Sequence, residues 1–229
     1  MPTPIICADP RLRQFADCFR SCFSKPQFQY FVTVLLALLL CLEAATCSGL
    51  QRAVCFGRSL AGLSRFLARA PWSPTAVAAA WTTRFRSQLA PAVATELARR
   101  KAARPPHPGR PPVTLVTGYL AGDDSVCAKL RARQPVRNAN PQRRPRPMAA
   151  LGRHYSSTAG KTVQGHDIVL THYMLLGRAC PQQPDLYRQQ EVCAQENVPF
   201  QSKIDLMAAQ IRRFVPLAGT RTHILLDSW

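Results

Sequence analysis

Hydrophobic positions in the first hundred residues recur at helical spacing, and short polar or proline-containing breaks separate one run from the next. Over residues 10–23, for example, Phe15, Cys18, Phe19 and Cys22 fall on one face of a helix. The same spacing, with a proline or a small polar residue at or just before each start, predicts further helices over 26–43, 46–54, 60–67 and 75–89. We therefore predict an N-terminal helical region over residues 1–98.

The periodicity changes after an arginine- and proline-rich segment, residues 99–112, which we interpret as a linker. Proline has no backbone N–H and clashes with the preceding helical turn, so such a segment should not continue a helix. Beyond the linker, the pattern predicts strands, extended segments and one helix, over 113–121, 162–163, 165–177, 200–214 and 222–226. The predicted fold class is therefore α+β or α/β, with a second domain over 113–229.

The second domain contains a basic stretch and a helix with an apolar stripe. Residues 130–147 are rich in arginine and proline and have no acidic residue, so we expect a basic insertion there. The predicted helix at 200–214 carries an apolar stripe that we expect to pack in the core, made of Ile204, Met207, Ala208 and Ile211.

The segment Tyr30–Leu42 is almost continuously apolar, but it is shorter than the roughly 20 residues that span a bilayer as a helix. We interpret it as a core helix, and a membrane anchor is the alternative. The 9 cysteines form no CxxC pair and no His/Cys cluster at zinc-finger spacing. We therefore expect a protein of the reducing cytoplasm that has no membrane partner.

The chain is strongly basic, with 30 Lys and Arg against 12 Asp and Glu and a net charge of +18. Arginine predominates, and its planar guanidinium donates two hydrogen bonds to a phosphate. This composition favours a nucleic-acid partner, although a genome rich in G and C would also raise the arginine content. Arg58, Arg65 and Arg69 lie on or beside a short helix that could read DNA in a helix-turn-helix, or they could simply be solvated.

Acidic residues follow two of the predicted strands. Asp123 and Asp124 come after the strand over 113–121, and Asp227 comes after the strand over 222–226. If these strands are parallel neighbours joined by a helical crossover, their ends meet and Asp227 lies near Asp123 or Asp124. Carboxylates in such a position can hold divalent metals that cleave phosphodiesters. The alternative is that each Asp is a turn residue or a helix cap.

The sequence around these acids resembles the DDE transposases of bacterial insertion sequences. The resemblance rests on several segments in the same order, which are Gly57–Leu60, Arg65–Trp72, Gly118–Ser125, Gly152–Ser157, Gly165-His166, Leu186–Cys193, Phe200–Leu206 and Gly219–Trp229. It implies a helical DNA-binding region followed by part of a ribonuclease-H-like domain. The implied activity is metal-dependent DNA strand cleavage and transfer at the ends of an insertion sequence.

The resemblance also implies site residues and a cofactor. One Asp of the pair at 123 and 124 is the first metal ligand and Asp227 is the second, with Mg²⁺ or Mn²⁺ as the metal. Because side chains alternate along a strand, only one member of the pair can face the site. We favour Asp124, which precedes the hydroxyl residue Ser125. His154, His166 and Lys161 lie in the shared segments without an assigned role.

Two departures from the family pattern bear on activity. The Glu that completes the catalytic triad would lie beyond Trp229, and the stretch over 130–147 is longer than the usual connection. We therefore expect a truncated transposase with little or no catalysis. The alternative is a non-catalytic DNA-binding remnant that regulates a full-length transposase. Double-stranded DNA is the expected partner, and a second copy of this chain or a full-length transposase is a further candidate.

Overall fold

The computed structural model describes residues 9–40, 46–54, 59–103, 109, 115–129 and 148–227. Arg58, the basic insertion over 130–147 and most of the predicted linker lie outside these residues. The chain divides into two compact units, residues 1–87 and 88–229, and we describe each one by itself.

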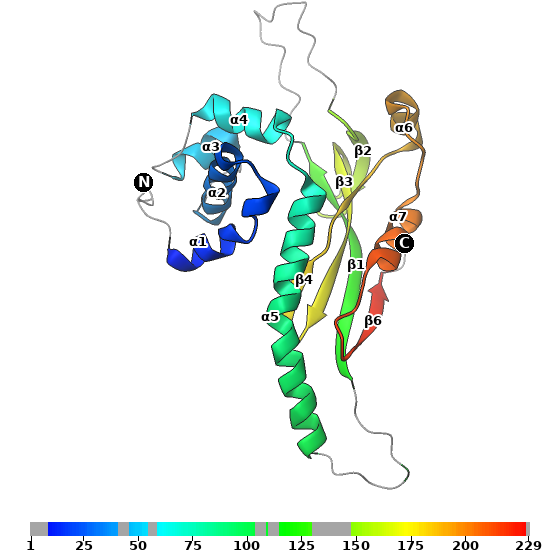
Figure 1. The fold of residues 1–229 in the computed structure, drawn as a ribbon. Helices are drawn as coiled ribbons and strands as arrows, with labels where there is room; N and C mark the ends of the chain where they lie inside the picture. Colours follow the sequence, from blue (N-terminus) through cyan, green and yellow to red (C-terminus); the bar gives the residue numbers. More distant parts are fainter. Residues whose placement is uncertain are drawn as a thin grey trace, which may run out of the picture. The chain divides into compact units, whose positions relative to one another are not determined.

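The first unit is helical, as predicted (Figure 1). Its elements are α1 (Pro10–Asp17), the 3-10 turn η1 (Arg20–Cys22), α2 (Lys25–Leu40), α3 (Cys47–Arg52), α4 (Leu60–Arg69) and the first part of α5 (Pro74–Ala103). Side-chain caps start four of these helices, because Asp9, Thr46, Ser59 and Ser73 each accept a hydrogen bond from a backbone N–H of the first turn.

The core of this unit forms where α2, α3 and α4 pack together. Its buried members are Leu36, Ala37, Leu50, Val54 and Leu63. Aromatic rings surround this core, and Phe66 stacks on both Tyr30 and Trp72. The described part of the apolar run, Tyr30–Leu40, therefore contributes to a protein core, as predicted. None of the helices that the structure describes has the length and apolarity needed to cross a membrane.

The prediction that the fifth helix ends near Leu89 is wrong, because α5 continues through Pro91 to Ala103. Glu96 explains part of this continuation, since it forms ion pairs with Arg99 and Arg100 one turn further on. Hydrogen bonds from these two guanidinium groups lower the pKa of Glu96 to about 2. The arginines that suggested a linker therefore extend the helix until the prolines follow.

The second unit is built on a mixed sheet. Its strands are β1 (Val116–Ala128), β2 (Gly152–Ser156), β3 (Lys161–Leu175), β4 (Arg178–Pro181), β5 (Asp185–Tyr187) and β6 (Thr220–Leu226). The strand order is β2-β3-β1-β6, and β4 and β5 also pair with β3. The central strand β3 is antiparallel to β1 and β2, whereas β6 is parallel to β1.

The first and last strands pair in parallel, which meets the condition under which we expect Asp227 to lie near Asp123 or Asp124. The predicted end of the first strand at Ala121 is wrong, because β1 continues to Ala128 and pairs along its whole second half with β3. The extended segments over 162–163 and 165–177 are one strand, β3, whose hairpin partner is β2. The pattern also missed the short elements β2, β4, β5 and α6 (Gln190–Glu196).

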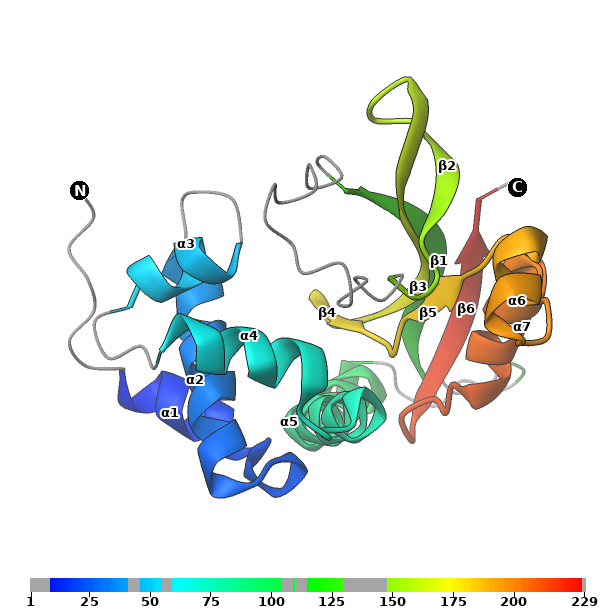
Figure 2. The same cartoon turned by 90° about the horizontal axis from the view of Figure 1, so that it is seen from above.

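The helices α6 and α7 (Lys203–Arg213) lie on the same face of the sheet (Figure 2). A capping box starts α7, since Ser202 and Asp205 each accept a hydrogen bond from the other's backbone N–H. Leu206 and Met207 pack on Val169 of β3 and form the buried contact between helix and sheet. The predicted core stripe is correct for Met207 but wrong for Ile204, whose side chain is 67% exposed.

The close approach of β1 to β3 at Gly165 generates a stability prediction. A Cβ at this position would lie 2.4 Å from the carbonyl oxygen of Cys127, and that backbone is fixed by the ladder. We expect Gly165→Ala to lower the free energy of unfolding by about 1–3 kcal/mol through overpacking. Urea unfolding would measure it, with Ser157→Ala in the exposed β2–β3 turn as the control. Equal midpoints for the two variants would contradict the tight packing.

Candidate functional site

Asp124 lies within β1 and faces the side of the sheet that α7 covers. Gly122, two residues earlier and therefore on the same face, lies directly against Met207 of α7. The side chain of Asp124 is 25% exposed and accepts a hydrogen bond from Lys203, the first residue of α7. Asp123 is exposed, and its carboxylate accepts a hydrogen bond from the backbone N–H of Asp124. The two acids therefore differ in orientation, as the alternation of the strand predicts.

Lys203 connects the strands through two carboxylates. Its Nζ lies 2.5 Å from Oδ2 of Asp124 and 2.7 Å from Oδ2 of Asp167, which belongs to β3. Burial tends to lower the pKa of Lys203, but its hydrogen bonds to both carboxylates outweigh this effect and raise the pKa above the ordinary value. Lys203 is therefore a charged group held between two strands.

Asp167 is the most deeply buried acid of this group. Its side chain is 1% exposed, and burial raises its pKa even though Lys203 opposes this change. His154 of β2 lies beside it, with Nδ1 3.4 Å from Oδ2 of Asp167. The ring of Tyr187 borders both His154 and Lys203. Two polar atoms of this centre, Oδ1 of Asp167 and Nε2 of His154, are buried and have no hydrogen-bond partner.

Asp227 directly follows β6 and is exposed. The preceding residue, Leu226, pairs with Gly122, so the end of β6 lies beside the part of β1 that carries the acids. Asp227 lines a shallow groove of about 260 Å³ between β6 and α7, together with Ile204, Met207, Ala208, Ile211 and Leu226. Within the residues that the structure describes, no three His, Cys, Asp or Glu side chains converge on a metal position.

Comparison of the chain with protein-family models, with curated proteins and with solved structures gives no match.

The remaining candidate residues have different surroundings. His166 contacts the backbone carbonyl of Ala149 through Nε2, at 3.0 Å, and Lys161 is exposed at the start of β3. Arg65 and Arg69 are exposed on α4, opposite the buried Leu63 of the same helix. The two arginines stay candidates for phosphate contact, whereas His166 has a structural partner.

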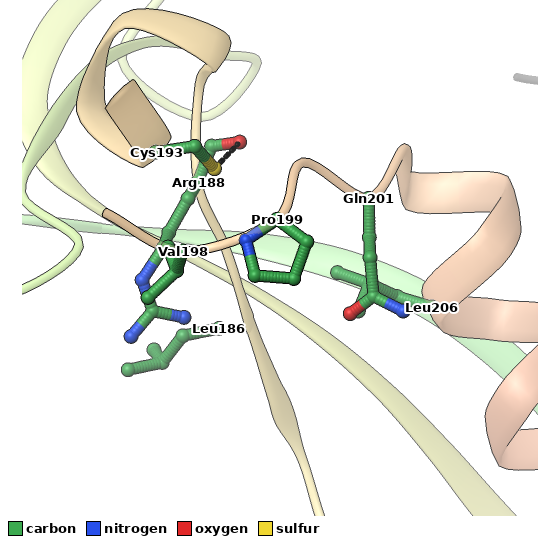
Figure 3. A pocket seen from close by; sticks show the side chains of 7 residues that line it. All are labelled: Leu186, Arg188, Cys193, Val198, Pro199, Gln201 and Leu206. Carbon is green, nitrogen blue, oxygen red and sulfur yellow. Dashed lines mark hydrogen bonds between the residues drawn. The ribbon is translucent and has the colours of Figure 1, made fainter. Parts of the chain in front are cut away.

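A second, smaller pocket of about 140 Å³ lies beside α6 (Figure 3). Its lining residues are Leu186, Arg188, Cys193, Val198, Pro199, Gln201 and Leu206. The guanidinium of Arg188 is already paired with Glu196, at 2.8 Å, and the thiol of Cys193 donates to the carbonyl of Arg188. The charged group of this pocket therefore serves the local fold.

The carboxylate oxygens of Asp124 and Asp167 are the kind of donor atom that a hard divalent cation prefers. Magnesium binds carboxylate oxygens and usually keeps several waters, so one or two carboxylates suffice. Asp124 and Asp167 present carboxylates to a common position, but the ammonium of Lys203 lies there. The position between the two carboxylates is therefore taken by a cation of the chain itself.

Sequence reasoning did not identify Asp167 or Lys203 as site residues. Asp167 lies on β3 in register with the buried positions Val169, Thr171 and Tyr173. A charged residue at a position where the alternation predicts an apolar one was the available signal, because a buried carboxylate needs a partner. Its partner Lys203 lies 36 positions further along, and sequence spacing does not predict that contact.

Burial of His154 generates a prediction about pH. Burial is the largest influence on this imidazole and lowers its pKa below the ordinary 6.5, although Asp167 opposes the change. Below pH 6.5, His154 therefore takes up a proton in the unfolded chain more readily than in the folded protein. The free energy of unfolding should then decrease as the pH falls. The slope for one proton is at most about 1.4 kcal/mol per pH unit.

We expect His154→Gln to remove this component from unfolding free energies measured between pH 7.5 and 5 in urea. His223→Gln, which removes an imidazole from the exposed strand β6, is the matched control. An unchanged pH slope in His154→Gln would show that the buried imidazole does not resist protonation.

Proposed function

We propose that this protein is a DNA-binding protein of the DDE-transposase type, a family whose activity is metal-dependent strand cleavage and transfer at insertion-sequence ends, and that this chain itself cleaves little or not at all. The observation that carries the proposal is the parallel pairing of β1 with β6, which brings the strands bearing Asp124 and Asp227 side by side. The ribonuclease-H-like domain that the resemblance implies would have a parallel pair of this kind, so the pairing supports the proposal. In such a site, Asp124 and Asp227 would hold Mg²⁺, which would supply activation of a water or a 3′-hydroxyl and charge stabilisation of the leaving oxygen.

The orientation of the carboxylates supports the same proposal. Asp124 faces α7 and is partly exposed, so a phosphate group can approach it, whereas Asp123 faces away. Lys203 fixes the Asp124 carboxylate from the first turn of α7 and neutralises its charge. In the present arrangement that ammonium opposes metal binding, so we propose that cleavage by this chain is weak.

The helical unit supplies the DNA-binding part of the proposal. Arg65 and Arg69 lie four residues apart on α4 and project from one exposed face, with no acidic residue on the helix. The helices α3 and α4 follow each other and both contact α2, as consecutive helices of a helix-turn-helix do. Two guanidinium groups at this spacing can contact neighbouring phosphates.

This arrangement predicts salt-sensitive DNA binding in which the two arginines take part. Each phosphate contact releases counterions, so affinity for a random DNA duplex should fall steeply between 50 and 200 mM salt. The double variant Arg65→Ala/Arg69→Ala should bind more weakly and show a salt slope smaller by about 2, roughly 1 for each contact. Retardation assays across the salt series would measure both quantities.

The matched control is Arg11→Ala/Lys25→Ala, which removes two exposed charges from the first turns of α1 and α2. Binding that does not depend on salt would contradict the proposed phosphate contacts. An equal loss of DNA affinity in both double variants would show that net charge causes the loss. It would contradict a specific contact between α4 and DNA.

The engagement of Asp124 by Lys203 predicts the outcome of a cleavage assay. With Mg²⁺ and supercoiled DNA that carries candidate ends, the wild-type chain should give no nicked product above the level of Asp227→Ala. Misplacement of a metal by a fraction of its bond length costs orders of magnitude in rate. Robust nicking that Asp227→Ala abolishes would show that the site is already competent and would reject this expectation.

A further inference from the structure

The ammonium of Lys203 lies where two carboxylates of neighbouring strands converge. Asp124 pairs with Val169 in the β1–β3 ladder, so Asp167, two residues before Val169, is its diagonal neighbour on the same face. Diagonal neighbours have their Cα atoms about 7–8 Å apart, a separation that a small cation can bridge through the two carboxylates. Nζ fills this position, at 2.5 Å from one carboxylate and 2.7 Å from the other.

Asp167 supplies a second and independent observation. Its side chain is 1% exposed, yet Oδ1 has no hydrogen-bond partner. An ionised carboxylate has about four acceptor positions, and burial without partners is costly. One lysine and a distant imidazole nitrogen leave this group short of donors. The centre therefore offers more acceptor capacity to a cation than the ammonium uses.

Lys203 is well placed to leave this position. Its side chain is 31% exposed. Lys203 is the first residue of α7, where the chain enters the helix from a loop. A long flexible side chain at such a site can turn to solvent without moving the buried face of the helix, which is formed by Leu206 and Met207.

We propose that Lys203 is an internal cation that occupies, and competes for, a divalent-cation site formed by Asp124 and Asp167. When the ammonium leaves, Mg²⁺ or Mn²⁺ takes its place with one oxygen from each carboxylate and water for the remaining positions. The assignment of Asp124 as a metal ligand rests on the proposed function. The inference adds Asp167 as its partner and makes displacement of Lys203 the step that controls access of the metal.

Mn²⁺ titration of Lys203→Met tests the proposal directly. Methionine keeps most of the apolar stem and removes the charge, so Mn²⁺ should bind roughly tenfold more tightly than to the wild type, a change of about 1.4 kcal/mol. The matched control is Lys161→Met, which removes an exposed charge from the start of β3 and should leave Mn²⁺ binding unchanged. The double variant Lys203→Met/Asp167→Asn should lose the gain. No gain in Lys203→Met would overturn the proposal.

A footprint of the wild-type protein keeps the proposal testable if Lys203→Met does not fold. Acetylation by an amine-reactive ester, followed by mass spectrometry, reports how accessible each lysine is. Saturating Mn²⁺ should raise the acetylation rate of Lys203 several-fold relative to the exposed Lys129 and Lys161, because displacement releases the amine. An unchanged rate for Lys203 would overturn the proposal.

Neither measurement uses DNA, so the two proposals can fail separately. Displacement of Lys203 by Mn²⁺ without any DNA binding would leave the cation site standing and reject the transposase-type function. DNA binding through α4 without displacement of Lys203 would do the reverse.

Discussion

The charge of Asp167 is the constraint on which the second unit depends. A carboxylate buried at the middle of a sheet is costly unless a cation and hydrogen bonds compensate it. Lys203 supplies the compensation, and in doing so it ties the first turn of α7 to both β1 and β3. The orientation of Asp124 and the charge balance around Asp167 depend on this ion pair, whereas Leu206 and Met207 hold the helix on the sheet. The chemistry of the site and the stability of the unit are therefore coupled.

The two carboxylates that Lys203 joins differ in their access to solvent. Asp124 is partly exposed and available to a ligand, whereas Asp167 is closed off from solvent. The ammonium of Lys203 compensates the charge of both carboxylates, although Oδ1 of Asp167 has no hydrogen-bond partner. The same lysine opposes any other cation at that position. At the proposed cation site, a stronger ion pair of Lys203 would therefore make metal binding weaker.

Much of the fold could be predicted because local patterns determine it. The helices of the first unit follow from apolar spacing and from caps such as Ser59, and the parallel pairing of β1 with β6 follows from a helix between two strands. Predictions failed where distant residues decide the outcome. β1 continues past Asp124 because β3 pairs with it, and Ile204 is exposed because Leu206 and Met207 form the contact with the sheet instead.

The candidate site was predictable in the same uneven way. Asp124 and Asp227 stood out because each lies at or just beyond a short apolar run of the sequence, and the strands that carry them are neighbours. Asp167 and Lys203 did not stand out, since one lies in an apolar strand and the other starts an ordinary amphipathic helix. Their pairing is a property of the folded chain, and it is this pairing that decides how the predicted acids can act.

The last strand has a practical consequence for anyone who handles this protein. β6 pairs with β1 on one side, and Ile224, Leu225 and Leu226 are each about half exposed on its two faces. Backbone donors and acceptors along an apolar strand at the border of a sheet can recruit strands from other molecules. The oligomeric state of this chain should therefore depend on protein concentration. Samples kept dilute throughout purification are the ones in which the monomer is best measured.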